Sequence, residues 1–166
     1  MNLSSFNTKN VNDISFMFWG CKSLTSINIS NFDTNNVERM NSMFNGCENL
    51  LYVNLSNFNT KKVKDMSQMF YECKSFTNLN LSNFNTKKVN DMSAMFYKCD
   101  SLNSLDISNF SIKKDTDISF LFFNCNNLIG LNFPNIEMKK IANKDNMLLG
   151  CSSLPYKYFS KYKFNI

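Results

Sequence analysis

Six cysteines are the residues that most clearly could do chemistry, because thiols form disulfides and bind metal ions. They are Cys21, Cys47, Cys73, Cys99, Cys125 and Cys151. Successive cysteines keep one constant 26-residue interval, there is no Cys-x-x-Cys, and the 166-residue chain has no histidine, so this is not the spacing of a zinc site. Cysteines stacked about 4.8 Å apart with parallel side chains also fit a disulfide poorly. We therefore predict buried free thiols, keep disulfides as the alternative, and expect no metal and no cofactor.

Lysines form a second regular set at one phase of the same 26-residue interval. The pairs are Lys61-Lys62, Lys87-Lys88, Lys113-Lys114 and Lys139-Lys140, and Lys9 begins the column. Stacked along one edge, they would form a stripe that binds a polyanion such as an acidic glycan or nucleic acid. The alternative is a solvated face that is partly neutralised by Asp13, Asp65, Asp91 and Asp117.

Small polar residues form a third set, beside apolar residues that alternate with them. The candidate ligand-binding members are Asn28, Tyr52, Asn54, Asn78, Asn80, Ser104, Asp106 and Asn132. Because neighbouring side chains of a strand point to opposite faces, these residues would form an outward sheet face rich in amide groups. Such a face could bind a glycan or an extended peptide; alternatively, its side chains hydrogen-bond to one another along the stack.

No catalytic set is evident, because every polar residue recurs with the repeat whereas an active site needs one unique cluster. We therefore expect no enzyme activity. The net charge is +5, and 43% of residues are hydrophobic, which excludes intrinsic disorder. No apolar run approaches the roughly 18 residues of a membrane helix, and residues 1–20 lack a signal-peptide pattern.

The elements that position these residues follow from the repeat, whose two halves have different hydrophobic periods. Ile27 and Ile29 alternate with polar residues, which indicates a short strand near residues 26–29. Val37, Met40, Met43 and Phe44 recur at helical spacing, which indicates a short helix near residues 36–45. Its N-cap would be Thr34, and Thr8, Thr60 and Thr86 stand at the same phase.

One strand and one helix per repeat can bury their apolar faces only by stacking on neighbouring units. We predict an α/β solenoid of about six units over residues 1–154, with parallel strands and a right-handed coil. The Phe and Met columns form its core. Pro155 cannot continue a ladder, so residues 155–166, aromatic and basic, form a C-terminal cap. The N-terminal unit is incomplete and uncapped, and it could self-associate end to end through its exposed edge.

Three segments resemble the repeat of BspA-like surface proteins, a leucine-rich-repeat family. They are residues 30–34 (Ser-Asn-Phe-Asp-Thr), 63–70 (Val-Lys-Asp-Met-Ser-Gln-Met-Phe) and 73–76 (Cys-Lys-Ser-Phe). The resemblance extends over about residues 3–154. It implies a leucine-rich-repeat solenoid and a secreted or cell-surface protein that acts in adhesion or host interaction with a protein or glycan partner. The family carries no catalytic residues to transfer.

Overall fold

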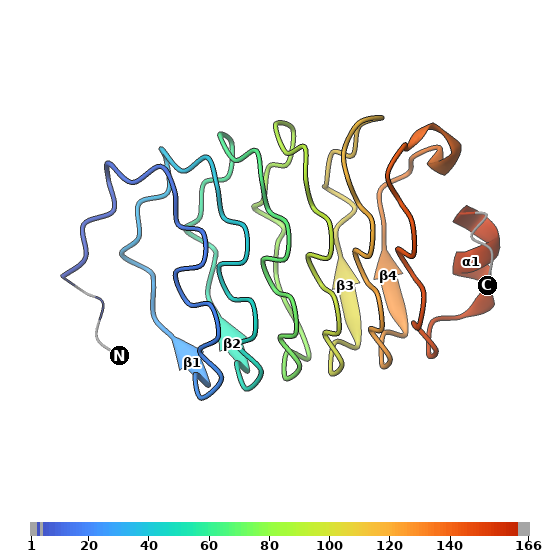
Figure 1. Cartoon of the computed structure of the whole chain (residues 1–166), viewed down its shortest axis with the longest axis horizontal. Coiled ribbons are helices and arrows are strands. Elements are labelled where there is room, and N and C mark those ends of the chain that lie inside the picture. The colour runs from blue at the N-terminus through green and yellow to red at the C-terminus, as the bar shows by residue number, and fades with distance from the viewer. Residues whose placement is uncertain (1–2, 4, 163–166) are drawn as a thin grey trace.

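The computed structural model describes residue 3 and residues 5–162, whose backbone winds in successive coils stacked side by side along one axis (Figure 1). Four short strands lie on one side of the coils: β1 (Ser26–Ile27), β2 (Tyr52–Val53), β3 (Ser104–Asp106) and β4 (Gly130–Asn132). β1 pairs with β2, and β3 with β4, both in parallel and between equivalent residues of adjacent repeats. The predicted parallel pairing of successive units is therefore confirmed.

The third coil differs from its neighbours, because it forms no strand at the expected residues 78–81. The sheet is consequently two separate pairs of strands, and the prediction of one strand in every repeat is wrong here. Among the described residues, no backbone hydrogen bond joins residues 77–80 to β2. Phe76 fills the core where the other coils carry leucine, and its ring meets Phe70 edge-on with centroids 5.8 Å apart. We attribute the gap to this larger side chain.

The prediction of a helix at residues 36–45 and its repeats is wrong. Alternate N–H groups in this segment donate to carbonyls of the next coil, as Ser42 does to Ser67 (2.9 Å) and Phe44 to Met69 (2.9 Å). Others close short turns, as Met43 does onto Met40 (3.3 Å). The apolar spacing that suggested a helix therefore arises from three-residue turns, whose amides bond between coils instead of within a helix.

Two backbone positions per coil adopt a left-handed conformation, which makes these turns possible. The first column comprises Phe16, Ser42, Gln68, Ala94, Phe120 and Asn146, with φ between 52° and 60°. The second comprises Gly20, Gly46, Glu72, Lys98, Asn124 and Gly150. Because Gly pays no steric penalty there and other residues do, the chain stores backbone strain at most of these positions.

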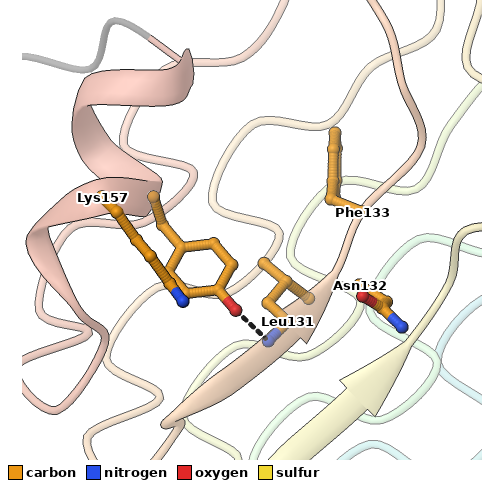
Figure 2. A pocket seen from close by; sticks show the side chains of 5 residues that line it. Leu131, Asn132, Phe133 and Lys157 are labelled. Atoms are coloured by element: carbon orange, nitrogen blue, oxygen red, sulfur yellow. Dashed lines mark hydrogen bonds between the residues drawn. The ribbon is translucent and has the colours of Figure 1, made fainter.

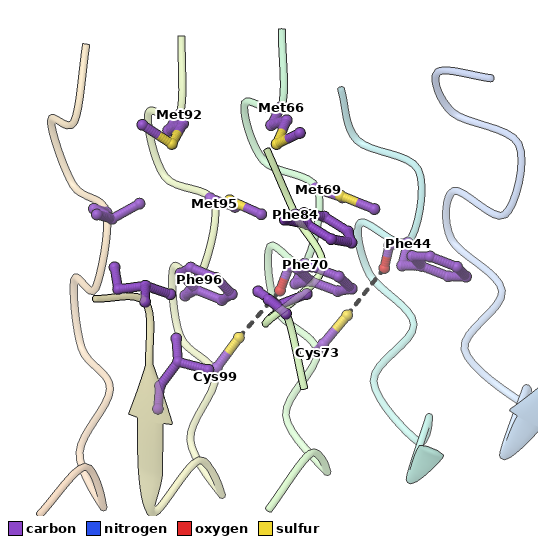
Figure 3. Close-up of a cluster of buried hydrophobic side chains, with 14 of the residues drawn as sticks. Phe44, Met66, Met69, Phe70, Cys73, Phe84, Met92, Met95, Phe96 and Cys99 are labelled. Carbon is purple, nitrogen blue, oxygen red and sulfur yellow. Dashed lines mark hydrogen bonds between the residues drawn. The ribbon is translucent and has the colours of Figure 1, made fainter. Parts of the chain in front are cut away.

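The core lies inside the coils and consists of columns of identical residues. Phe18, Phe44, Phe70, Phe96 and Phe122 stack with ring centroids 5.3–5.8 Å apart, and Figure 3 shows Phe44, Phe70 and Phe96 of this column. Met66, Met92 and their equivalents are also fully buried. The assignment of the Phe and Met columns to the core is confirmed, except in the first coil, where Phe6 and Met17 are exposed.

The cysteines are free thiols, as predicted, and all are buried except Cys21, which is half-buried. Each buried thiol donates to a phenylalanine carbonyl of the preceding coil; Cys73 Sγ, for example, lies 3.1 Å from the carbonyl oxygen of Phe44 (Figure 3). Burial raises the pKa of Cys47 and of Cys151 to about 12. Since the thiolate is the reactive form, these cysteines serve packing.

Two polar columns tie the coils together. The buried Thr60 hydroxyl donates to the carbonyl of Asn85 (3.1 Å) and accepts from its N–H (2.7 Å), and Thr8, Thr34 and Thr86 do the same one coil apart. The prediction of threonine N-caps is thus wrong, because there is no helix to cap. The side chain of Asn57 likewise donates to carbonyls of the preceding coil, including that of Phe32 (3.0 Å).

The coil pattern ends at Pro155. Leu51 and Ile129, at the same phase, donate their N–H groups to carbonyls of the preceding coil at 2.9 and 2.8 Å, and proline has no N–H to donate. Instead, helix α1 (Tyr156–Tyr162) stands where the next strand would lie (Figure 1). Tyr158 and Phe159 of α1 pack against the core. A 3-10 turn, η1 (Met138–Lys140), lies in the segment between β4 and α1.

Candidate ligand-binding face

All eight residues predicted to form a polar sheet face are exposed in the structure. The structure brings four of them together: Tyr52, Asn54, Asn78 and Asn80 line one crevice of about 150 Å³ between β2 and residues 78–83. The other four lie elsewhere on the face: Asn28, Ser104, Asp106 and Asn132. The crevice lies at the gap between the two pairs of strands.

The crevice combines an apolar floor with a polar rim. Val53 and Leu55 are buried beneath it and Leu79 is half-buried. Tyr52 is 61% exposed, whereas the equivalent positions of other coils carry Ser26, Asn78, Ser104 and Gly130. A ring beside amide groups suits a ligand that stacks and also accepts hydrogen bonds.

The asparagines of the rim keep their donors available. The Oδ1 atoms of Asn54 and Asn80 accept from the N–H groups of Ser56 and Ser82, both at 3.0 Å. Their Nδ2 groups, and the side chain of Asn78, make no hydrogen bond to any other described residue. The local turn therefore uses the acceptor of Asn54 and Asn80 and directs the donors to solvent.

The alternative of a self-bonded side-chain ladder holds at one place on this face. Asn132 Nδ2 donates to Asp106 Oδ2 at 3.0 Å. Hydrogen bonds from the Ser108 hydroxyl and N–H, and then this bond, lower the pKa of Asp106. Elsewhere, the ladder between coils belongs to a different asparagine column, that of Asn57 and Asn83. Sequence alone did not separate the structural asparagines from those with free donors.

The lysine stripe is present and exposed. Seven of its lysines form no ion pair with any described residue: Lys9, Lys61, Lys62, Lys87, Lys88, Lys113 and Lys114. Lys139 and Lys140 pair with Glu137 at 3.5 and 2.9 Å. None of the described ion pairs joins these lysines to the aspartates expected to neutralise the stripe in part, and Asp13 pairs instead with Arg39 of the next coil at 2.8 Å. Asp65 accepts from Ser67 and Asp91 from Ser93.

Two features were missed in the sequence. Tyr71, Tyr97 and Phe123 stack with centroids 4.4 and 4.8 Å apart, and their 26-residue spacing could have revealed them. A second cavity of about 310 Å³ lies between β4 and α1 and is lined by Leu131, Asn132, Phe133, Lys157 and Tyr158 (Figure 2). The feature of the sequence that could have indicated this cavity is Pro155, which ends the ladder.

We searched the described residues, residue 3 and residues 5–162, for metal-binding groups and for membrane-spanning helices. No three side chains of His, Cys, Asp or Glu come together there in a group that could hold a metal ion. No helix in this part of the chain has the length and apolar character needed to cross a membrane.

Comparisons with known proteins place these observations in a family. A family model described as "Mycoplasma protein of unknown function, DUF285" matches residues 1–80 and residues 51–162. No curated protein sequence matches the chain. The crystal structure of the T. pallidum leucine-rich repeat protein TpLRR is similar, with a TM-score of 0.52 and 19% identity over 98% of this chain and 81% of that chain. The leucine-rich-repeat fold and the resemblance to BspA-like repeat proteins are thereby confirmed.

Proposed function

The chain belongs to the DUF285 family of Mycoplasma proteins of unknown function, and we propose that it acts by binding, without catalysis. The partner is an extended, uncharged molecule rich in hydrogen-bond acceptors, a glycan or the backbone of a protein segment. It lies on the polar sheet face and places one sugar ring or one side chain in the crevice. We propose a cell-surface or secreted location, in keeping with BspA-like proteins, and a right-handed coil.

The observation that carries this proposal is the set of amide donors around the crevice. Asn54, Asn78 and Asn80 offer Nδ2 groups that no described residue uses, and Tyr52 adds an exposed ring. A volume of about 150 Å³ is below the 300–1,000 Å³ of sites that enclose a small molecule. It therefore suits one unit of a longer partner that continues along the face.

The polar face supports binding over catalysis for a chemical reason. Its residues are amides and hydroxyls repeated coil after coil, which can hold a repetitive ligand in register. A reaction would need one preorganised set of acid, base or nucleophile, and the buried thiols are held as donors to backbone carbonyls.

A titration of ¹⁵N-labelled protein tests the proposal with three neutral probes: chitohexaose, maltohexaose and an uncharged Gly-Ser peptide. We expect saturable shifts of the side-chain amides of Asn54, Asn78 and Asn80 with at least one probe. Asn78→Ala should weaken that binding by about fivefold to tenfold, the cost of about one hydrogen bond. The matched control is Asn90→Ala, which changes an exposed asparagine outside the polar sheet face and should leave affinity unchanged. Equal losses in both variants would contradict a site in the crevice.

A second candidate function is binding of an acidic polysaccharide along the lysine stripe. The seven stripe lysines without an ion pair to a described residue favour it, because surface cations at a few ångströms' spacing attract a linear polyanion. The stripe positions carry no aromatic residue on which bases could stack, which favours a polysaccharide over single-stranded nucleic acid.

Retention on heparin tests this second candidate. Replacing Lys61, Lys62, Lys87 and Lys88 with Gln should abolish retention that otherwise weakens steeply with salt. The matched control replaces four ion-paired lysines instead, Lys22, Lys64, Lys74 and Lys98, so the net charge changes equally. Equal loss in both variants would contradict a specific stripe.

A further inference from the structure

Among the described residues, no strand lies beside the outer edge of β4, where the repeat predicts one. Residues 156–158 are the 26-residue equivalents of β4 (Gly130–Asn132), yet they form the start of α1. Gly130 donates to Asn103, and Asn132 accepts from Ile107, so these two residues bond toward the preceding coil. Leu131, between them, bonds in the opposite direction, to Tyr158 of α1.

That bond is long for a buried amide. Leu131 is 3% exposed, and its N–H lies 3.5 Å from the Tyr158 hydroxyl, drawn as the dashed line in Figure 2. Protein N–H groups usually lie 2.7–3.2 Å from their acceptors. A backbone carbonyl from another strand would therefore be a better partner than this hydroxyl, as in the parallel pairing of β3 with β4.

The cavity beside this edge has the size and charge for a peptide strand. Its volume is about 310 Å³, within the range of ligand sites. Lys157 lines it, with Nζ 5.4 Å from the centroid of the Tyr158 ring, and pairs with no acid among the described residues. An unpaired ammonium beside an underused N–H attracts a carboxylate-bearing strand.

We propose that β4 and α1 form a second binding site, which accepts an extended peptide carrying a carboxylate. The peptide adds to β4 as a further strand and takes the Leu131 N–H from the Tyr158 hydroxyl, while its carboxylate pairs with Lys157. This is strand addition, set in a different part of the molecule from the crevice. The carboxylate is either an acidic side chain or the free end of the peptide.

Three peptides test the proposal by their effect on the ¹⁵N shift of the Leu131 amide in the full chain. They are TVEVT with both ends blocked, TVQVT with both ends blocked, and TVQVT with a free carboxyl end. We expect the blocked TVEVT peptide, the free-ended TVQVT peptide or both to shift this amide saturably, and to bind about threefold to fivefold more tightly than blocked TVQVT. Which of the two binds identifies the source of the carboxylate.

Four variants separate recognition from mere structural support. Lys157→Gln should remove the preference for a carboxylate, and Tyr158→Phe, which deletes the competing hydroxyl, should leave peptide affinity equal or higher. The controls are Lys88→Gln and Tyr156→Phe, which change exposed residues outside the cavity. An unshifted Leu131 amide at about 5 mM peptide, equal affinity for all three peptides, or weaker binding by Tyr158→Phe would overturn the proposal.

Discussion

Replacing Thr60 with valine tests the ladder that holds the coils together. The two side chains have nearly the same shape, so the substitution removes the hydroxyl and little else. Thr60 is 1% exposed, and its hydroxyl both donates to and accepts from the backbone of Asn85 in the next coil, at 3.1 and 2.7 Å. Valine would leave one N–H and one C=O of Asn85 without partners.

The expected loss of stability follows from those two groups. An unsatisfied buried backbone group costs about 1–3 kcal/mol, and these bonds are partly buried, so each group should fall in the lower half of that range. We expect Thr60→Val to lower the free energy of unfolding by about 2–4 kcal/mol. Thr60→Ser keeps the hydroxyl and should lose about 1 kcal/mol for the missing methyl group.

Urea unfolding measures these losses, and hydrogen exchange locates them. The Asn85 amide should exchange faster in Thr60→Val, and Thr77→Val, which changes an exposed threonine, should leave stability within about 0.5 kcal/mol of the parent. Faster exchange at residues 62 and 63 with no change at Asn85 would indicate a helix N-cap and refute the ladder.

Three further expectations concern strain, thiols and association. Ala94→Gly should stabilise the protein by about 0.5–1 kcal/mol in urea unfolding, because Ala94 has φ 52°, whereas Ala142→Gly, outside the left-handed column, should destabilise it. Because burial raises the pKa of Cys47 from 9.0 to about 12, its contribution to stability is present below pH 9 and lost as pH rises toward 12. Cys47→Ala should therefore flatten the dependence of the free energy of unfolding on pH between 9 and 12. An unchanged dependence would contradict the raised pKa. Phe16 and Trp19 are 56% and 63% exposed, so sedimentation should show self-association that is insensitive to salt. The double variant Phe16→Ser, Trp19→Asn introduces the residues found at the equivalent positions Ser42 and Asn45 and should abolish this association. A dimer that persists in the double variant would place the contact elsewhere.

The columns were predictable from the sequence because a solenoid repeats the environment of each phase. Once Phe44, Phe70 and Phe96 recur at the 26-residue interval, one inward direction serves all of them. The same logic identified the exposed polar face and the free thiols. Side-chain direction within a coil is thus local information that the repeat amplifies.

The helix was mispredicted because its evidence was also local. Val37, Met40 and Met43 recur at a spacing of three, which a helix and a run of three-residue turns share. The interactions that decide between them are bonds such as that from Ser42 to Ser67 in the next coil. Gly20, Gly46 and Gly150 at one phase were the available hint of left-handed turns.

The crevice could not be predicted, because it depends on how one coil departs from the pattern. Phe76 replaces leucine in the core, and residues 77–80 fail to pair with β2. The repeat pattern alone predicts an unbroken sheet there. The four crevice residues were nevertheless among those predicted for binding, because the outward phase was assigned correctly.

Phe76→Leu tests the central claim most directly, because it restores the core residue of the other coils without altering any residue that lines the crevice. The measurement is the shift of the Asn78 side-chain amide with the neutral oligosaccharide or peptide that binds the parent protein. We predict that the variant gains protection of backbone amides between β2 and residues 77–80 and loses the saturable Asn78 shift. Gained protection with unchanged binding would contradict a binding site in the crevice.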